Sequence, residues 1–274
     1  MANQSNVLQF DATERYLEGR TALVTGGFDG IGLAIARELV RRGVSVSVGA
    51  RRGSDSHACD ALERRLMATG GCAHAGKLDV QKSKSIGAFV SATEATLGPI
   101  DILVNAAGVT AHHSTCGHST ELWRRVIDTN LTGPFQMIRT CLPGMIARRW
   151  GRIVNIASTA AHTAVADHAA YCASKSGLLG LTRAVALEGA PHGVTCVAIS
   201  PTWVETEMLR DSMAVASGKS GRSTEEEIEG LGKTNPQGRI IQAEEIAGLV
   251  AFLCSDAARG ITMEDIQVTG GALW

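Results

Sequence analysis

The sequence lacks any long apolar run: none of its 274 residues lies in a stretch approaching the roughly 18 apolar residues that a membrane-spanning helix needs. The first residues, Met-Ala-Asn-Gln-Ser-Asn, lack the basic start and apolar block of a secretory leader. The formal net charge is only -1, and the arginine pairs are scattered rather than gathered into a basic stripe. We therefore expect neither a membrane nor a nucleic acid as the main partner.

Cys-x-x-Cys pairs are also absent, although the chain has seven cysteines. They are odd in number and widely spaced, and several lie in apolar runs, as small core residues do. This usage is typical of a reducing compartment, so we expect a cytoplasmic protein.

Apolar runs typical of buried strands alternate with segments of helical periodicity, and no break in composition divides the 274 residues. This rhythm predicts one α/β domain with a Rossmann-type, doubly wound, seven-stranded parallel sheet and helices on both faces. The expected strands are 21–25, 44–49, 72–80, 100–105, 152–157, 194–199 and 265–268. The expected helices are 33–42, 58–70, 83–97, 119–131, 134–149, 169–187 and 243–255.

Three segments lie outside this rhythm. Residues 1–18 are polar and predict an N-terminal arm ahead of a catalytic domain at 19–274. Between about 203 and 238 the composition becomes rich in Ser, Gly, Lys and Glu, which indicates a substrate lid or a disordered loop; we favour a lid with hinges near Gly218 and Gly232. The apolar ending Gly270–Trp274 suggests burial against another subunit, and hence a homo-oligomer.

A glycine-rich turn, Gly26-Gly27-Phe28-Asp29-Gly30-Ile31-Gly32, joins the first strand to the first helix. Glycines allow positive φ and a close approach of backbone to ligand, and the free N–H groups at a helix start attract an anion. The turn fits the pyrophosphate of a dinucleotide, although a simple tight strand-to-helix connection would look similar.

Where the second strand ends, a carboxylate would hold the ribose 2′-OH of NAD, but this chain has Ala50 followed by Arg51. A guanidinium there suits the 2′-phosphate of NADP; the alternative is that Arg51 is an ordinary loop charge. Asp79, after the third strand, is a candidate acceptor for adenine N6. The small residues Ala106 and Gly108, after Asn105, leave space for a ring or ribose.

Ser158 follows the fifth strand, and Tyr171 and Lys175 are four residues apart in the expected helix, so they share one helix face. A nearby ammonium favours the phenolate, so we expect the pKa of Tyr171 to lie below its usual value near 10 and the phenol to act as a general acid and base. A Tyr-x-x-x-Lys pair is also common as an ordinary surface pair.

One loop gathers His112, His113, Cys116 and His118. These residue types can ligate metals, but their spacing does not match a tetrahedral site, so we expect no metal and a loop bordering the substrate pocket.

Over roughly residues 19–272 the chain resembles the short-chain dehydrogenase/reductase family. The resemblance rests on Thr25-Gly26-x-x-x-Gly30-Ile31-Gly32, Asn105-Ala106-Ala107-Gly108, Asn130 in Asp-Thr-Asn-Leu, Ser158, and Tyr171-x-x-x-Lys175. It implies Tyr171 as acid/base, Lys175 as its electrostatic partner and nicotinamide-ribose ligand, Ser158 as the carbonyl-orienting hydroxyl, and Asn130 as holder of a proton-relay water. The implied cofactor-binding residues are Gly26, Phe28, Asp29, Gly30, Ile31, Arg51, Asp79, Val80, Asn105, Ala106, Gly108, Tyr171, Lys175, Pro201, Val204 and Thr206.

Two positions depart from the family pattern. Thr202 replaces the glycine that usually follows Pro201, which places a side chain near the nicotinamide pocket. Asp29 stands where NADP-preferring members often carry a basic residue, so its charge opposes a nearby phosphate. Because Arg51 offers a direct partner, NADP(H) is favoured over NAD(H).

The resemblance implies interconversion of a ketone and a secondary alcohol, with a 3-oxoacyl thioester or polyketide-like ketone as the leading substrate class. The segment from Ser223 to the Gly-Gly ending looks similar to ketoreductases of that kind. Alternatives are a dehydrogenase of a cyclic or aryl secondary alcohol, using NAD or NADP, and a non-catalytic dinucleotide-binding sensor. The expected assembly is a homotetramer or homodimer.

Overall fold

The computed structural model describes residues 15–272, so most of the predicted N-terminal arm and the terminal Leu273 and Trp274 lie outside the described residues. The described chain forms a seven-stranded parallel sheet with the order β3-β2-β1-β4-β5-β6-β7. This doubly wound order confirms the predicted fold class. The strands are β1 Thr21–Thr25, β2 Ser45–Ala50, β3 Ala73–Lys77, β4 Ile102–Asn105, β5 Gly151–Ile156, β6 Val194–Pro201 and β7 Asp265–Val268.

The central strands are apolar throughout because helices cover both faces of the sheet. Within β1, Ala22 and Val24 pack into one core cluster, whereas Leu23 packs into a second cluster on the opposite face. This is the two-residue alternation of a strand. The helices in order are α1 Gly30–Arg41, α2 Ser56–Met67, α3 Ser83–Leu97, α4 Thr120–Ile127, α5 Gly133–Arg148, α6 Ala169–Gly189, α7 Glu207–Ser220, α8 Thr224–Thr234 and α9 Ala243–Cys254.

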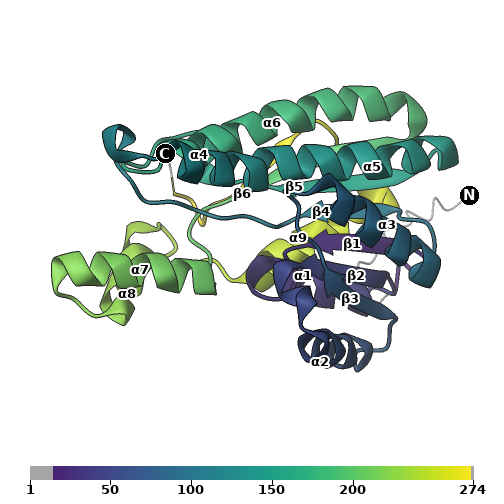
Figure 1. Cartoon of the computed structure of the whole chain (residues 1–274), viewed down its shortest axis with the longest axis horizontal. Helices are drawn as coiled ribbons and strands as arrows, with labels where there is room; N and C mark the ends of the chain where they lie inside the picture. The colour runs from purple at the N-terminus through teal and green to yellow at the C-terminus, as the bar shows by residue number, and fades with distance from the viewer. Residues whose placement is uncertain (1–14, 273–274) are drawn as a thin grey trace, which may run out of the picture.

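Two helical layers enclose the sheet (Figure 1). Buried residues of α1, α2 and α9 belong to the cluster around Val24, and buried residues of α3, α5 and α6 belong to the cluster around Leu23. The carboxyl ends of the strands therefore meet at one edge of a sheet that both layers hold in place.

The helices expected at 119–131 and 134–149 are joined rather than separate. Asp128–Thr132 forms a π-helical turn that connects α4 to α5 without a break. Such turns are uncommon and often lie at functional sites. Here the turn carries Asn130, one of the predicted catalytic residues.

The segment predicted as a lid is helical. Its polar composition indicated a lid or a disordered loop, but α7 and α8 occupy most of it and project from the body of the molecule (Figure 1). Gly218 and Gly232 lie inside these helices, and the glycines of this segment with positive φ are Gly221, which caps the end of α7, and Gly238. A capping box between Ser223 and Glu226 starts α8.

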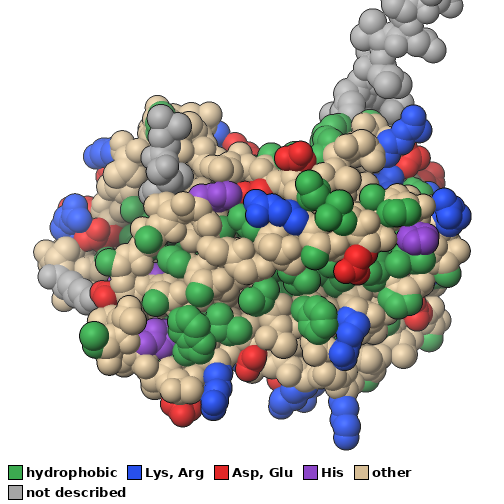
Figure 2. Space-filling view, turned by 90° about the horizontal axis from the view of Figure 1, so that it is seen from above, with side chains coloured by type: hydrophobic (Ala, Val, Ile, Leu, Met, Phe, Trp, Pro, Cys, Tyr) green, Lys and Arg blue, Asp and Glu red, His purple; other side chains and the backbone are tan. Residues whose placement is uncertain are grey.

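The face formed by α4, α5 and α6 carries exposed hydrophobic side chains. Seen from above, they gather over the middle of the molecule (Figure 2). Trp123, Phe135 and Leu187 are exposed on α4, α5 and α6, respectively. None of the helices in residues 15–272 combines the length and hydrophobicity needed to span a bilayer.

Candidate active site

A pocket of about 270 Å³ lies at the carboxyl ends of β1, β2 and β4. Ligands of doubly wound sheets bind at this edge. Eleven of the predicted cofactor-binding residues line the pocket: Gly26, Phe28, Asp29, Gly30, Ile31, Arg51, Asp79, Val80, Ala106, Gly108 and Thr206.

The glycine turn is packed too closely to accept side chains. Gly26 has a φ of +69°, and a Cβ there would lie 2.7 Å from Cα of Ala107. A Cβ on Gly32 would lie 2.4 Å from the carbonyl oxygen of Gly26. No side chain caps the first turn of α1, so its N–H groups face the pocket edge. The turn therefore fits a dinucleotide pyrophosphate both in space and in hydrogen-bonding capacity.

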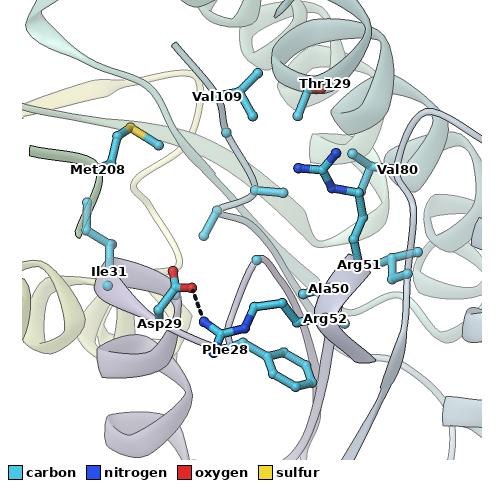
Figure 3. Close-up of a pocket in the computed structure, with 18 of the residues that line it drawn as sticks. Phe28, Asp29, Ile31, Ala50, Arg51, Arg52, Val80, Val109, Thr129 and Met208 are labelled. Atoms are coloured by element: carbon cyan, nitrogen blue, oxygen red, sulfur yellow. Dashed lines mark hydrogen bonds and ion pairs between the residues drawn. The ribbon is translucent and has the colours of Figure 1, made fainter. Parts of the chain in front are cut away.

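Two arginines follow β2 and extend in different directions. Arg51 extends into the pocket toward Val80 and Thr129, whereas Arg52 extends toward Asp29 (Figure 3). Nη1 of Arg52 lies 3.3 Å from Oδ2 of Asp29. Within the described residues Arg51 has no carboxylate partner. The charge of Asp29 is thus partly compensated, and the Arg51 guanidinium is available to an anion.

Asp79 lines the pocket just after β3; its Oδ1 accepts the N–H of Gln81 at 3.1 Å, and its Oδ2 lies 3.6 Å from Nζ of Lys82. Gln81 in turn donates to the hydroxyl of Thr129 at 2.7 Å. The sequence interpretation missed Gln81, Thr129 and Met208 as lining residues. Thr129 directly precedes Asn130, and Met208 lies near the start of the predicted lid. Their positions next to these recognised segments could have indicated that they line the pocket.

Ser158, Tyr171 and Lys175 meet where β5 ends and α6 begins. The Ser158 hydroxyl hydrogen-bonds the Tyr171 hydroxyl and also accepts the N–H of Ala160 at 3.1 Å. Nζ of Lys175 donates to the carbonyl of Ile156 at 2.7 Å and lies 5.6 Å from the centre of the Tyr171 ring. The buried cation therefore lies over the Tyr171 ring, in a cation–π arrangement.

The expectation of a lowered Tyr171 pKa is wrong for this arrangement. Burial raises the pKa of Tyr171, and the hydrogen bond from Ser158 opposes that rise. Burial also lowers the pKa of Lys175 to about 8. A helical i, i+4 spacing predicts that two side chains are neighbours, but the change in pKa depends on how deeply the tertiary fold desolvates each of them.

The side chain of Asn130 forms hydrogen bonds to two other segments of the protein, at Val109 and Ser174. Its Oδ1 accepts the N–H of Val109 at 2.9 Å, and its Nδ2 donates to the carbonyl of Val109 and to the Ser174 hydroxyl. The ideal Cβ position of Gly108 lies 3.7 Å from Oδ1 of Asn130 and 3.8 Å from Nζ of Lys175. Gly108 thus connects the dinucleotide pocket to the group formed by Asn130, Ser158, Tyr171 and Lys175.

Several predicted cofactor residues lie beside the pocket instead of lining it. Asn105 is buried and donates to Oδ1 of Asn155 at 2.8 Å. Val204 packs in the core next to Ile241. Pro201 ends β6, and the N–H of Thr202 donates to the carbonyl of Val268 at 3.1 Å. Thr202 does not have positive φ, so this turn accepts a threonine in place of glycine.

The histidine loop borders Tyr171. The backbones of His113 and His168 pair in an isolated parallel β-bridge. The His168 ring lies edge-on to the Tyr171 ring, with the ring centroids 6.5 Å apart. Nε2 of His112 lies 4.0 Å from a carboxylate oxygen of Asp167. Across residues 15–272 no group of three or more His, Cys, Asp or Glu side chains is arranged to hold a metal ion.

A glycine turn at a helix start beside a Ser–Tyr–Lys set defines a dinucleotide-dependent oxidoreductase of the Rossmann class. Residues 26–272 match the family model described as enoyl-(acyl carrier protein) reductase. The chain belongs to the short-chain dehydrogenase/reductase family and is an NAD(P)-dependent enzyme that acts on CH–OH groups.

Its relatives include a protein of Streptomyces virginiae named for the ketoacyl reductase of the monensin polyketide synthase, which is 44% identical over 92% of this chain and 96% of the relative. A protein of Streptomyces coelicolor named as a ketoacyl reductase is 39% identical over 93% of this chain and 97% of the relative. A crystal structure of a single-residue variant of the actinorhodin polyketide ketoreductase with NADPH has a TM-score of 0.87 and 39% identity, over 92% of this chain and 96% of that one.

Proposed function

We propose that this chain is an NADP(H)-dependent ketoreductase that reduces a ketone of a 3-oxoacyl thioester or polyketide-like substrate to a secondary alcohol. One observation carries the proposal: Ser158, Tyr171 and Lys175 converge beside a pocket whose glycine turn fits a dinucleotide. The substrate class is supported by relatives named as ketoacyl and polyketide ketoreductases.

When bound in the dinucleotide pocket, a reduced nicotinamide would supply the hydride to the carbonyl carbon. Tyr171 donates a proton to the oxygen of the substrate ketone, and Ser158 orients that oxygen through its hydroxyl. Because burial raises the pKa of Tyr171, the phenol remains protonated near neutral pH. A protonated phenol is the form that donates a proton in ketone reduction.

Lys175 and Asn130 position the reacting groups. Lys175 is held by the carbonyl of Ile156, which fixes its ammonium beside the Tyr171 ring and near Gly108 at the dinucleotide pocket. From there it would hold the nicotinamide ribose. The side chain of Asn130 is occupied by Val109 and Ser174. We therefore assign its contact with a relay water to the main chain of the π-helical turn, where the usual helical hydrogen bonds are interrupted.

Arg51 is the proposed partner of the 2′-phosphate of NADP. Its substitution by Ala should raise the KM for NADPH by about 10- to 100-fold, the loss expected for a charge-assisted contact, and leave the KM for NADH nearly unchanged. Arg64→Ala, an exposed change on α2, is the matched control. Equal losses with both cofactors would contradict the assignment.

We also propose that residues 203–238 act as the substrate lid. Thr206 and Met208 line the dinucleotide pocket, and α7 and α8 continue from it away from the sheet. A homo-oligomer is supported by the exposed hydrophobic side chains on α4, α5 and α6. A cytoplasmic location is supported by seven free cysteines, two of them exposed at Cys72 and Cys116.

The direct test is consumption of NADPH in the presence of a panel of 3-oxoacyl thioesters, cyclic ketones and aryl ketones. We expect reduction of the thioesters or of polyketide-like cyclic ketones, with NADPH preferred to NADH. Turnover confined to the oxidation of simple cyclic or aryl alcohols with NAD would overturn the proposal in favour of an alcohol dehydrogenase.

A further inference from the structure

A second pocket, of about 420 Å³, lies at the opposite edge of the sheet from the dinucleotide pocket. Two of its lining residues, Arg152 and Thr195, are the second residues of β5 and β6, so the pocket opens at the amino ends of these strands. Its volume falls in the range of small-molecule sites. None of the residues assigned to the ketoreductase reaction lines it.

The charge of this pocket is strongly one-sided. Four arginines line it, at positions 20, 149, 152 and 259, with a single carboxylate, that of Asp256. The side chain of Asp256 is 76% exposed, so water screens much of its attraction for Arg152, 3.2 Å away. In residues 15–272 neither Arg20 nor Arg259 has a carboxylate partner.

Among the four arginines, Arg152 has a deeply buried side chain, of which only 3% is exposed. Its Nη1 donates to the carbonyls of Gly151 and Gly193, but its Nε is buried and has no hydrogen-bond partner among the described residues. A buried guanidinium N–H without an acceptor is costly. Burial also lowers the pKa of Arg152, as expected for a cation with too little compensating charge.

Two of the guanidinium groups are brought together on one indole ring. Cζ of Arg20 lies 3.7 Å from the centre of the Trp150 ring, and Cζ of Arg152 lies 4.3 Å from it. Each contact is attractive, but the charge of Arg20 lowers the pKa of Arg152, so the two cations repel each other in a partly desolvated site. An anion in the pocket would compensate both charges at once.

Arg149 adds an independent observation. It ends α5 with a φ of 56°, in the left-handed region where glycine is the favoured residue. A non-glycine residue is disfavoured there, yet Arg149 lines the pocket, and its Nη2 donates to the carbonyl of Pro191 at 3.2 Å. A substitution to glycine therefore removes the charge while making the backbone conformation easier to adopt.

We propose that this pocket binds a phosphate-type oxyanion, either inorganic phosphate or the phosphate group of a small metabolite. Arg20, Arg152 and Arg259 would surround the anion, with Arg149 at the rim. The inference concerns a site separate from the proposed ketoreductase centre and does not depend on its substrate.

The test is thermal unfolding of the NADPH-saturated protein in phosphate and in chloride at equal ionic strength, with the cofactor occupying the dinucleotide pocket. At a phosphate concentration about tenfold above the dissociation constant, we expect Tm to rise by roughly 3–5 °C. Arg149→Gly and Arg259→Ala should each lose at least half of this rise, while Arg149→Gly keeps or raises Tm in chloride. Arg65→Ala, an exposed change on α2, should keep the whole rise.

A parallel series with glycerol 3-phosphate identifies the source of the phosphate. A larger rise than with inorganic phosphate indicates a phosphorylated metabolite, and an equal or smaller rise indicates the free ion; both support the site. The proposal is overturned if Tm is the same in phosphate and in chloride. It is also overturned if Arg149→Gly and Arg259→Ala both keep the whole increase in Tm that phosphate causes.

Discussion

Tyr171 lies in an environment in which burial and hydrogen bonding act in opposite directions on the phenol. Burial raises its pKa, and the Ser158 hydroxyl stabilises the phenolate. If the phenol is the proton donor, Tyr171→Phe should lower kcat for ketone reduction by about 10²- to 10⁴-fold. The dissociation constant of NADPH, measured by fluorescence titration, should change by less than about twofold. Substantial residual reduction in this variant would rule out Tyr171 as the donor.

Lys175 gives a prediction for stability as a function of pH. Burial lowers its pKa in the folded state from 10.5 to about 8, so between these values the unfolded chain binds more protons than the folded chain. Stability contributed by this group therefore rises with pH across that window. Relative to Lys175→Met, the wild-type free energy of unfolding should increase between pH 8 and 10.5 by about 3 kcal/mol.

The comparison must be made as a difference between the two proteins. Burial raises the pKa of the Cys141 and Cys254 thiols to about 12, so these groups make the wild type and the variant alike less stable as pH rises above 9. Urea titrations of both proteins at a series of pH values give the difference in the free energy of unfolding, which is the contribution of Lys175. If the difference between them does not change with pH, the ammonium of Lys175 is not desolvated as described.

Among the elements, the connection from β1 to α1 depends most strictly on glycine. A Cβ at Gly26 would meet the backbone of Ala107 at 2.7 Å, and its φ of +69° disfavours any side chain. Gly26→Ala should therefore destabilise the protein by more than about 2 kcal/mol and weaken NADPH binding. Urea denaturation and cofactor titration measure the two effects.

Gly180 provides the matched control in the same experiment. It lies on the exposed side of α6, and a Cβ there would have no heavy atom within 4 Å. Gly180→Ala should stabilise the protein by about 0.5–1 kcal/mol because alanine favours the helix. Destabilisation of both variants to the same degree would show that the close packing of the turn at Gly26 is not what requires glycine.

The elements that were predictable from sequence are those whose patterns are set by burial on the sheet. The strands Thr21–Thr25 and Asp265–Val268 and the helix Ser83–Leu97 have the predicted bounds, because apolar runs and Gly98 mark their limits. The strand predicted at 72–80 is shorter, at Ala73–Lys77, because Leu78 and Asp79 already turn toward the pocket edge.

The features that the sequence interpretation did not give have two origins, one local in the sequence and one that depends on distant contacts. The helices α7 and α8 have polar faces and are stabilised by contacts between residues close in sequence. Ser223 and Glu226 form a capping box, and Arg222 forms an ion pair with Glu227 at 2.9 Å. The pattern Ser-x-x-Glu was a signal for that helix start. The π-helical turn at Asn130 had no comparable signal, because it is stabilised by bonds to Val109 and Ser174 from other elements.

On the scale of the whole molecule, the parallel sheet explains why residues scattered from Gly26 to Thr206 act together. Several site residues lie just beyond the ends of parallel strands, which all end at one edge: Gly26, Arg51, Asp79, Ala106 and Ser158. Tyr171 and Lys175 lie on α6, and Lys175 donates to the carbonyl of Ile156 at the end of β5. The predicted site residues adjoin that edge, whereas the arginine pocket lies at the other edge. β5 runs between the two, with Arg152 near its beginning and Ser158 just beyond its end.

The exposed hydrophobic face gives the prediction that concerns assembly. Phe135 is 43% exposed on α5 and Leu187 is 67% exposed on α6. If this face packs against a second copy, Phe135→Glu should shift the protein toward the monomer in light scattering coupled to size exclusion. The folded monomer should tolerate the change, since Arg139, whose guanidinium lies 5.7 Å from the Phe135 ring centre, can pair with the new carboxylate.

Met67→Glu is the control, because Met67 is also exposed, at 45%, but lies at the end of α2 in the opposite layer. It should leave the assembly unchanged. If the wild type elutes at the monomer mass of 28.7 kDa, or if Met67→Glu dissociates it and Phe135→Glu does not, the interface is not on α4, α5 and α6.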